Sequence, residues 1–173
     1  SNRESVISTV QKHPGLRFHE LRKETRLANG TLQHHLNQLK MADDIDIVYT
    51  AKIPRYFSKG LETKSAVVLN RLRQNTTSRI IKSLLKNKCM SFGQIVKESK
   101  KSAGTVSVYK NMLLNDKIIE GNTDECGHCP DMANKIKYRL VNAEQVHSLV
   151  SEYGKSSLRQ SADNLSDVFL SLR

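Results

Sequence analysis

An internal repeat constrains the fold of this chain more than any other feature of its sequence. Residues 18–39, FHELRKETRLANGTLQHHLNQL, align without a gap with residues 92–113, FGQIVKESKKSAGTVSVYKNML, at an offset of 74. The same register extends backwards, where Val6 aligns with Ile80. Self-similarity at a fixed offset indicates a repeated structural unit. Because 173 residues suffice for two small domains, each half is predicted to be one copy of that unit.

Hydrophobic spacing predicts three helices and a hairpin in the first copy. One helix ends at His-Pro-Gly, residues 13–15, and a second begins at Phe18. Asn29 is expected to cap a third helix, whose apolar stripe consists of Leu32, Leu36 and Leu39. Two strands, over 45–49 and 53–57, flank a tight turn at residues 51–52. This order is typical of a winged helix-turn-helix.

The second copy repeats this order and completes the predicted fold. Helices are expected over 78–86, 92–99 and, capped by Ser102, 103–114, with strands near 117–122 and 135–140. The fold class is therefore mainly α with small β-hairpins, an α+β fold of two tandem winged-helix domains plus a C-terminal helix. Domains are expected over residues 1–60 and 77–141, with a connecting helix over 61–76. A C-terminal helical segment is expected over 142–173, as one broken helix or two consecutive helices over 143–153 and 158–172.

Two strings carry a resemblance to a known family. NGTLQHHLNQLKMADDI and SAGTVSVYKNMLLNDKII each combine a Gly-Thr-hydrophobic helix start with a polar turn leading into the wing. In this the chain resembles the tandem winged-helix transcription regulators found especially in archaea, related in pattern to the bacterial MarR and ArsR groups. The resemblance implies binding of double-stranded DNA by the third helix, and a homodimer formed through the terminal helix. Alternatively, the terminal helix packs on its own domain.

The third helix of the first copy offers side chains suited to base readout. Gln33, His34 and Asn37 are predicted to face outwards, where they can exchange hydrogen bonds with base edges. Thr31, near the start of the helix, also faces outwards and suits a phosphate or a thymine methyl. Four cations nearby are candidates for phosphate contacts, namely Arg26, Lys40, Lys52 and Arg55. The alternative is a solvated polar face, which any surface helix has.

The second copy has a weaker set of candidates. Its residues are Lys100, Lys101, Thr105, Ser107, Lys110 and Asn111. Val108 occupies the position of His34 and cannot form a hydrogen bond, and the wing carries Asp124, Glu125 and Asp131, which phosphates repel. We therefore hypothesise that the first copy reads the sequence, whereas the second contributes phosphate contacts, dimerisation or sensing.

The string DECGHCPD, residues 124–131, lies in the second wing and has three interpretations. The first is a zinc site with Cys126 and Cys129 as tentative ligands, His128 and Cys89 being less favoured. The second is a Cys126–Cys129 pair that oxidises reversibly, and the third is a plain loop. A thiol oxidoreductase is disfavoured, because the acidic neighbours raise the thiol pKa values. An odd number of cysteines argues against a disulfide framework, and Cys89 is expected to be a partly buried core residue.

Charge and composition narrow the class of protein. A net charge of +11 favours a polyanionic partner. No apolar run approaches the roughly 20 residues of a membrane span, and the opening SNRESVIS lacks a signal-peptide core, so a cytoplasmic protein without a membrane partner is expected. No phosphate loop, catalytic carboxylate pair or nucleophile elbow is present, which indicates neither an enzyme nor a small-molecule substrate. Apart from zinc, no cofactor is indicated. The alternative to a transcription regulator is an adaptor that binds protein.

Overall fold

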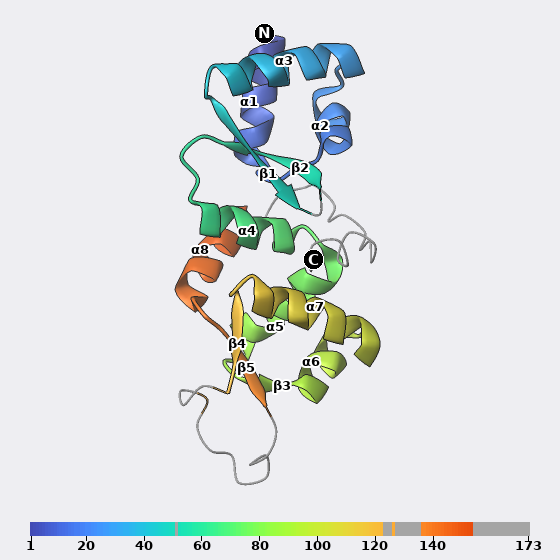
Figure 1. The fold of residues 1–173 in the computed structure, drawn as a ribbon, viewed down its shortest axis with the longest axis vertical. Coiled ribbons are helices and arrows are strands. Elements are labelled where there is room, and N and C mark those ends of the chain that lie inside the picture. Colours follow the sequence, from blue (N-terminus) through green and yellow to red (C-terminus); the bar gives the residue numbers. More distant parts are fainter. Residues whose placement is uncertain (51, 123–125, 127–135, 154–173) are drawn as a thin grey trace.

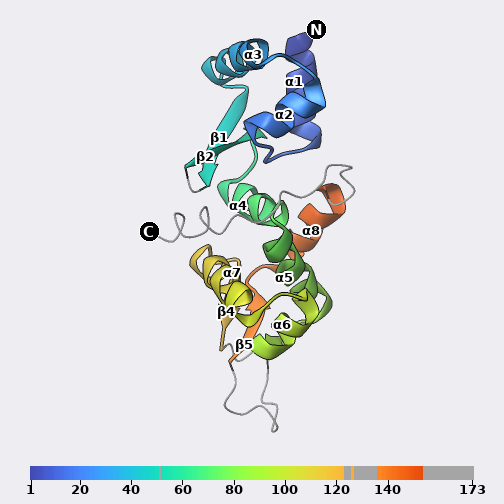
Figure 2. The same cartoon turned by 90° about the vertical axis from the view of Figure 1, so that its right-hand side faces the viewer.

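The computed structural model describes residues 1–50, 52–122, 126 and 136–153. Two groups of short helices, each with its own small sheet, lie one after the other along the longest axis (Figure 1). A single helix, α4 (Thr63–Leu72), runs between them in both views (Figures 1 and 2). The predicted fold class, mainly α with small β-hairpins, is confirmed.

The first half contains three helices followed by an antiparallel hairpin. Its elements are α1 (Asn2–Lys12), α2 (Phe18–Thr25), α3 (Asn29–Met41), β1 (Ile45–Thr50) and β2 (Ile53–Ser58). Ser1 and Glu4 form a capping box that begins α1. The α3 stripe of Leu32, Leu36 and Leu39 is buried, as its spacing predicts, so the opposite face of α3 points away from this core.

The second half repeats the order with an additional short strand and a further helix. Its elements are α5 (Asn75–Lys86), β3 (Met90–Ser91), α6 (Phe92–Ser99), α7 (Ala103–Asn115), β4 (Ile119–Gly121), β5 (Lys137–Leu140) and α8 (Ala143–Tyr153). The three strands form an antiparallel sheet in the order β3-β5-β4. The Ser102 hydroxyl accepts a hydrogen bond from the Thr105 N–H, 3.3 Å away, and caps α7 as predicted.

The sequence repeat extends to details of the backbone. The bounds of α6 and α7 are those of α2 and α3 moved by the same offset. Arg26 and its counterpart Lys100 both adopt the left-handed conformation, with φ of 58° and 56°. The isolated bridge between Leu16 and Tyr56 corresponds to the pairing of β3 with β5 in the second half. Both halves therefore share one chain path as well as one hydrophobic pattern.

Three details differ from the sequence prediction. Asn29 does not cap α3, because the cap position belongs to Ala28 and the Asn29 side-chain oxygen instead accepts a hydrogen bond from Arg22. Helix α5 begins at Asn75, earlier than residue 78. The helix predicted over 158–172 lies outside the described residues, whereas the one over 143–153 is confirmed as α8.

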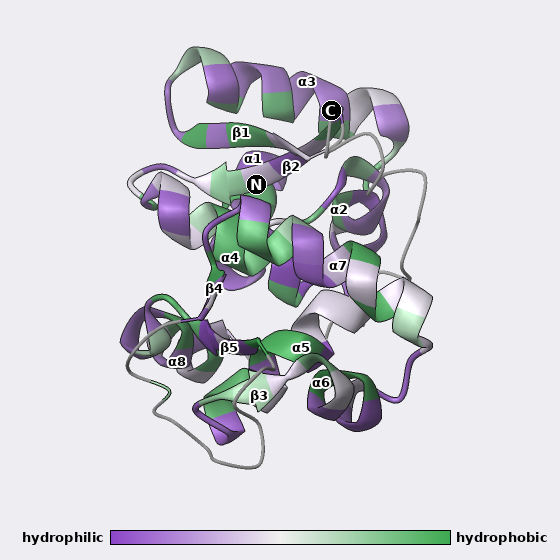
Figure 3. Ribbon diagram, turned by 60° about the horizontal axis from the view of Figure 1, so that its bottom comes forward, coloured by the Kyte–Doolittle hydropathy of each residue, from purple (hydrophilic) through white to green (hydrophobic). Residues whose placement is uncertain are grey.

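The two halves have separate hydrophobic cores, and α4 contributes to the second. Hydrophobic residues gather on α4 and α5, whereas hydrophilic and hydrophobic residues alternate along α3 (Figure 3). Phe57, although it belongs to β2, is 1% exposed and lies in the second core. Two hydrogen bonds also join the α4 region to the first half. The Asn70 amide donates to Thr50 Oγ1 at 2.8 Å, and Arg73 Nε donates to the Pro14 carbonyl at 3.3 Å. Helix α4 is thus bonded to the first half as well as buried in the second.

Candidate nucleic-acid interface

Helix α3 lies at one end of the molecule (Figure 1). Thr31, Gln33, His34 and Asn37 are all exposed, as predicted. Gln33 Nε2 donates to Asn37 Oδ1 at 2.9 Å, which sets the two amides side by side one turn apart. Amide groups of this kind pair with the N6 and N7 atoms of adenine. The outer face of α3 can therefore offer both donors and acceptors to a base edge.

Exposed cations lie on α3 and on the segments that flank it along the chain. Arg26 lies in the turn between α2 and α3, Lys40 lies in the last turn of α3, and Lys52 lies in the turn between β1 and β2. Two further cations that were not predicted, Arg22 and Lys23, are exposed in the last turn of α2. Both residues lie just before the turn between α2 and α3, and this position in the sequence could have predicted them as phosphate contacts. Long flexible cations around a polar helix face suit contact with phosphates.

The assignment of Arg55 as a phosphate contact is wrong, because the structure buries this side chain. Arg55 is 3% exposed, and its Nη1 donates to the Gly15 carbonyl at 2.9 Å. Burial lowers the pKa of its guanidinium to about 10, although Glu20 opposes this effect. Alternate residues of a strand share a face, so Arg55 points to the same side as the buried Phe57. Arg55 therefore joins β2 to the turn after α1 and is not part of the interface.

The corresponding face of α7 is less accessible. Thr105, Ser107, Val108 and Lys110 are half-buried, whereas Asn111 is exposed. The Lys110 ammonium lies 5.1 Å from the centre of the Phe92 ring and 5.4 Å from that of Tyr138, in cation–π contacts.

Two further cations precede α7. Lys100 is exposed and Lys101 is half-buried. The second half thus keeps part of its charge near α7, but the face of α7 presents fewer exposed hydrogen-bonding groups than that of α3.

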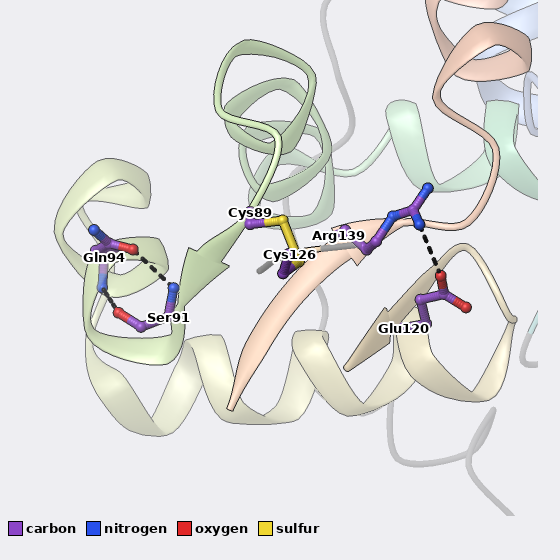
Figure 4. The surroundings of a disulfide bond; sticks show 6 residues. All are labelled: Cys89, Ser91, Gln94, Glu120, Cys126 and Arg139. Atoms are coloured by element: carbon purple, nitrogen blue, oxygen red, sulfur yellow. Dashed lines mark hydrogen bonds and ion pairs between the residues drawn. A yellow bond between two sulfur atoms is a disulfide. The ribbon is translucent and has the colours of Figure 1, made fainter. Parts of the chain in front are cut away.

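A disulfide replaces the cysteine arrangement expected from the sequence. Cys89, just before β3, is bonded to Cys126, with their Cα atoms 5.7 Å apart (Figure 4). Cys89 is therefore not simply a core residue, and the Cys126 sulfur is not a thiolate that could bind zinc in this form. Cys129 and His128 lie outside the described residues. Within the part of the chain that the structure describes, no cluster of three metal-ligating side chains occurs.

The pairing that brings these cysteines together follows from the sheet. Met90 of β3 lies opposite Tyr138 of β5, which places Cys89 at the edge of the wing. On the other strand of the wing, Arg139 Nη1 lies 3.5 Å from the Glu120 carboxylate (Figure 4). The disulfide therefore ties the second wing to the segment that enters α6.

Comparison with known proteins finds a match to the first part of the chain. A family model described as an N-terminal HTH domain, HTH_HVO_0163_N, matches residues 1–68. No curated protein matches the chain. Over the described residues, every helix is too short or too polar to cross a membrane. The matched range contains α1 to β2 and the beginning of α4, so the N-terminal part of this chain is a helix-turn-helix domain.

Proposed function

We propose that this protein is a regulator of transcription that binds double-stranded DNA in a sequence-specific manner through α3. The observation that carries the proposal is the α3 face, where Gln33, His34 and Asn37 are exposed together on a helix-turn-helix domain. In a helix-turn-helix, which here consists of α2 and α3, the second helix enters the major groove with its outward side chains against base edges. That helix is α3. A net charge of +11 supports a polyanionic partner of this kind.

A division of labour between the two copies forms part of the proposal. Gln33 and Asn37 are exposed and hydrogen-bonded to each other, whereas Val108 packs against the second core and Lys110 lies over two aromatic rings. The second copy is then left with phosphate contacts from Lys100, dimerisation or sensing.

Paired substitutions test this division. Gln33→Ala with Asn37→Ala should weaken binding to a preferred duplex by about 10- to 100-fold and leave binding to unrelated duplexes nearly unchanged. Ser107→Ala with Asn111→Ala is the matched control, and its effect should stay within about threefold. Fluorescence anisotropy on both duplexes measures these values. Equal losses from the two pairs would show that the copies read DNA alike.

The proposed assembly is a homodimer of chains that each carry two winged-helix domains, over residues 1–60 and 77–141. Matching backbone conformations at Arg26 and Lys100 support the second domain as a copy of the first. Sedimentation equilibrium of the full chain tests the dimer, since a molar mass near twice 19.6 kDa is expected. A single species at 19.6 kDa would contradict it.

An adaptor that binds protein is the second candidate, favoured by two exposed apolar side chains of the first half. Met41 at the end of α3 is 88% exposed and Tyr49 on β1 is 63% exposed. Exposed apolar groups are common on surfaces that bind protein.

The dependence on salt separates the two candidates. Contacts from Arg22, Arg26, Lys40 and Lys52 in each chain of a dimer predict a slope of log K against log salt of about −7. An adaptor should show neither a sequence preference for DNA nor a strong dependence of DNA affinity on salt.

Regulation through the second wing is a further part of the proposal, and the disulfide makes a redox response better supported than zinc. Two thiols, Cys89 and Cys126, would lose two electrons and two protons to a peroxide, which is reduced to water or an alcohol and water. Peptide mapping by mass spectrometry before and after peroxide treatment should show the linked Cys89 and Cys126 peptides only in the oxidised sample. Bound zinc in protein purified without chelator would support the other interpretation.

A further inference from the structure

A cavity of about 430 Å³ opens between α4 and the second half. Its walls come from α4, from the turn that follows α7 and from the start of α8. The floor is apolar, because Val68, Ile118 and Val146 are each at most 5% exposed yet line the cavity. Beside them Val141, another lining residue, is 45% exposed. The volume of the cavity lies in the range of small-molecule sites.

The mouth of the cavity is positively charged. Lys64 and Lys117 line it and are exposed, and neither takes part in an ion pair within the described residues. Asp116 also lines the cavity, but both of its carboxylate oxygens are bound by Arg71, at 2.5 and 3.3 Å. Arg71 therefore compensates the charge of Asp116. The ammonium groups of Lys64 and Lys117 remain at the cavity without an ion-pair partner among the described residues.

We propose that this cavity binds a small organic anion, namely a carboxylate with an apolar tail or ring. The tail would lie on Val68, Ile118 and Val146, and the carboxylate would meet the ammonium groups of Lys64 and Lys117. Apolar burial supplies binding energy for such a ligand, while a few polar groups set its orientation. A neutral ligand of the same shape would forgo the charged contacts.

As an extension that rests on the proposed function, this anion would act as an effector of DNA binding. Helix α4 forms one wall of the cavity, and on the other side it is bonded to the first half through Asn70 and Arg73. A ligand that favours one placement of α4 would therefore bias how α3 is presented to DNA. The effect requires only that the affinity for the ligand differ between two placements of α4.

Isothermal titration calorimetry of the full chain tests the site itself, with octanoate as the probe and octanamide as its neutral match. Octanoate should bind with a stoichiometry of one per chain, and octanamide at least about fivefold more weakly. No heat with octanoate, or equal affinity for the two compounds, would overturn the assignment.

Variants locate the site. Val67→Phe fills the cavity from α4 and should reduce octanoate affinity by about 10-fold or more. Lys117→Asn removes one charge but keeps a residue that tolerates the left-handed backbone, where φ is 59°, so the fold is retained. It should weaken octanoate about two- to fivefold, whereas Lys86→Gln, an exposed lysine on α5, should leave it unchanged. Affinity that is equal in all variants would place the ligand elsewhere.

The role as effector has its own measurement. DNA affinity is measured with and without octanoate for the wild-type chain and for Lys117→Asn. A shift of about fivefold or more that shrinks in the variant is expected. If octanoate binds but DNA affinity does not respond, the effector role fails while the site stands. If no DNA binds at all, the proposed function fails, and the calorimetric result for the site is unaffected.

Discussion

The ion pair between Arg71 and Asp116 allows a sharp test of how α4 is held against the second half. Both side chains are largely buried, with exposed fractions of 7% and 14%. Asp116 is also the C-cap residue of α7, where the helix dipole disfavours a negative charge. Removal of one partner from a buried pair costs about 3–5 kcal/mol. We expect Arg71→Met to cost about 3 kcal/mol, near the lower limit, because the carboxylate retains some access to water.

The double substitution distinguishes the loss of one charged partner from the replacement of the whole ion pair. Arg71→Met with Asp116→Leu replaces the pair by apolar groups, so no charge is left buried, and it should cost only about 1 kcal/mol. Urea denaturation followed by circular dichroism gives the free energy of unfolding for each variant and for Lys82→Met, an exposed control on α5. A loss below about 1 kcal/mol for Arg71→Met, or additive losses in the double variant, would refute this reasoning.

Three further predictions follow from the fold. Phe57→Ala should lower the free energy of unfolding by about 3–5 kcal/mol in calorimetry, since the ring fills the second core, whereas Tyr49→Ala, at an exposed site, should change it by less than about 0.5 kcal/mol. Arg26→Gly should raise that free energy by about 1 kcal/mol by relieving the left-handed backbone, yet weaken binding to all duplexes equally, as melting and anisotropy would show. Burial, and then the charge of Arg73, holds the pKa of His13 below its usual 6.5. The unfolded chain therefore binds the proton more readily, so stability is full above about pH 6.5 and declines as the pH falls towards the folded pKa. Urea titrations at about pH 7.5 and 5 should show this decline, and His13→Gln should reduce it. A stability that rises on acidification would contradict the assignment for His13.

Local patterns determine most of the fold, and for this reason the sequence could predict it. The stripe of Leu32, Leu36 and Leu39 indicates both the extent of α3 and the side that faces outwards. The repeat then transfers this assignment to α7, and the hydroxyl of Ser102 marks the beginning of that helix. The exposed candidates Gln33, His34 and Asn37 follow from the same periodicity, since positions outside an apolar stripe point to solvent.

Tertiary contacts decide what the sequence could not predict. Arg55 is buried on the face of β2 that it shares with Phe57, where its guanidinium donates to the Gly15 carbonyl. Strand alternation places both residues on one side but does not indicate that this side is covered. Cys89 and Cys126, 37 residues apart in the sequence, come together because β3 pairs with β5. Strand β3 has only two residues, too few for its sequence to predict this long-range pairing. Asn29 does not cap α3, because the cap position falls one residue earlier, at Ala28, and the Asn29 side-chain oxygen accepts a hydrogen bond from Arg22.

Selection from a random library of double-stranded DNA tests the central claim most directly. The full chain and the Gln33→Ala, Asn37→Ala variant are each used to enrich bound duplexes at moderate salt, and the enriched pools are sequenced. The wild-type chain should enrich one motif, and the variant should lose the preference at adenine positions while keeping non-specific affinity. A wild-type pool without any enriched motif, or the same motif from both proteins, would contradict readout by α3.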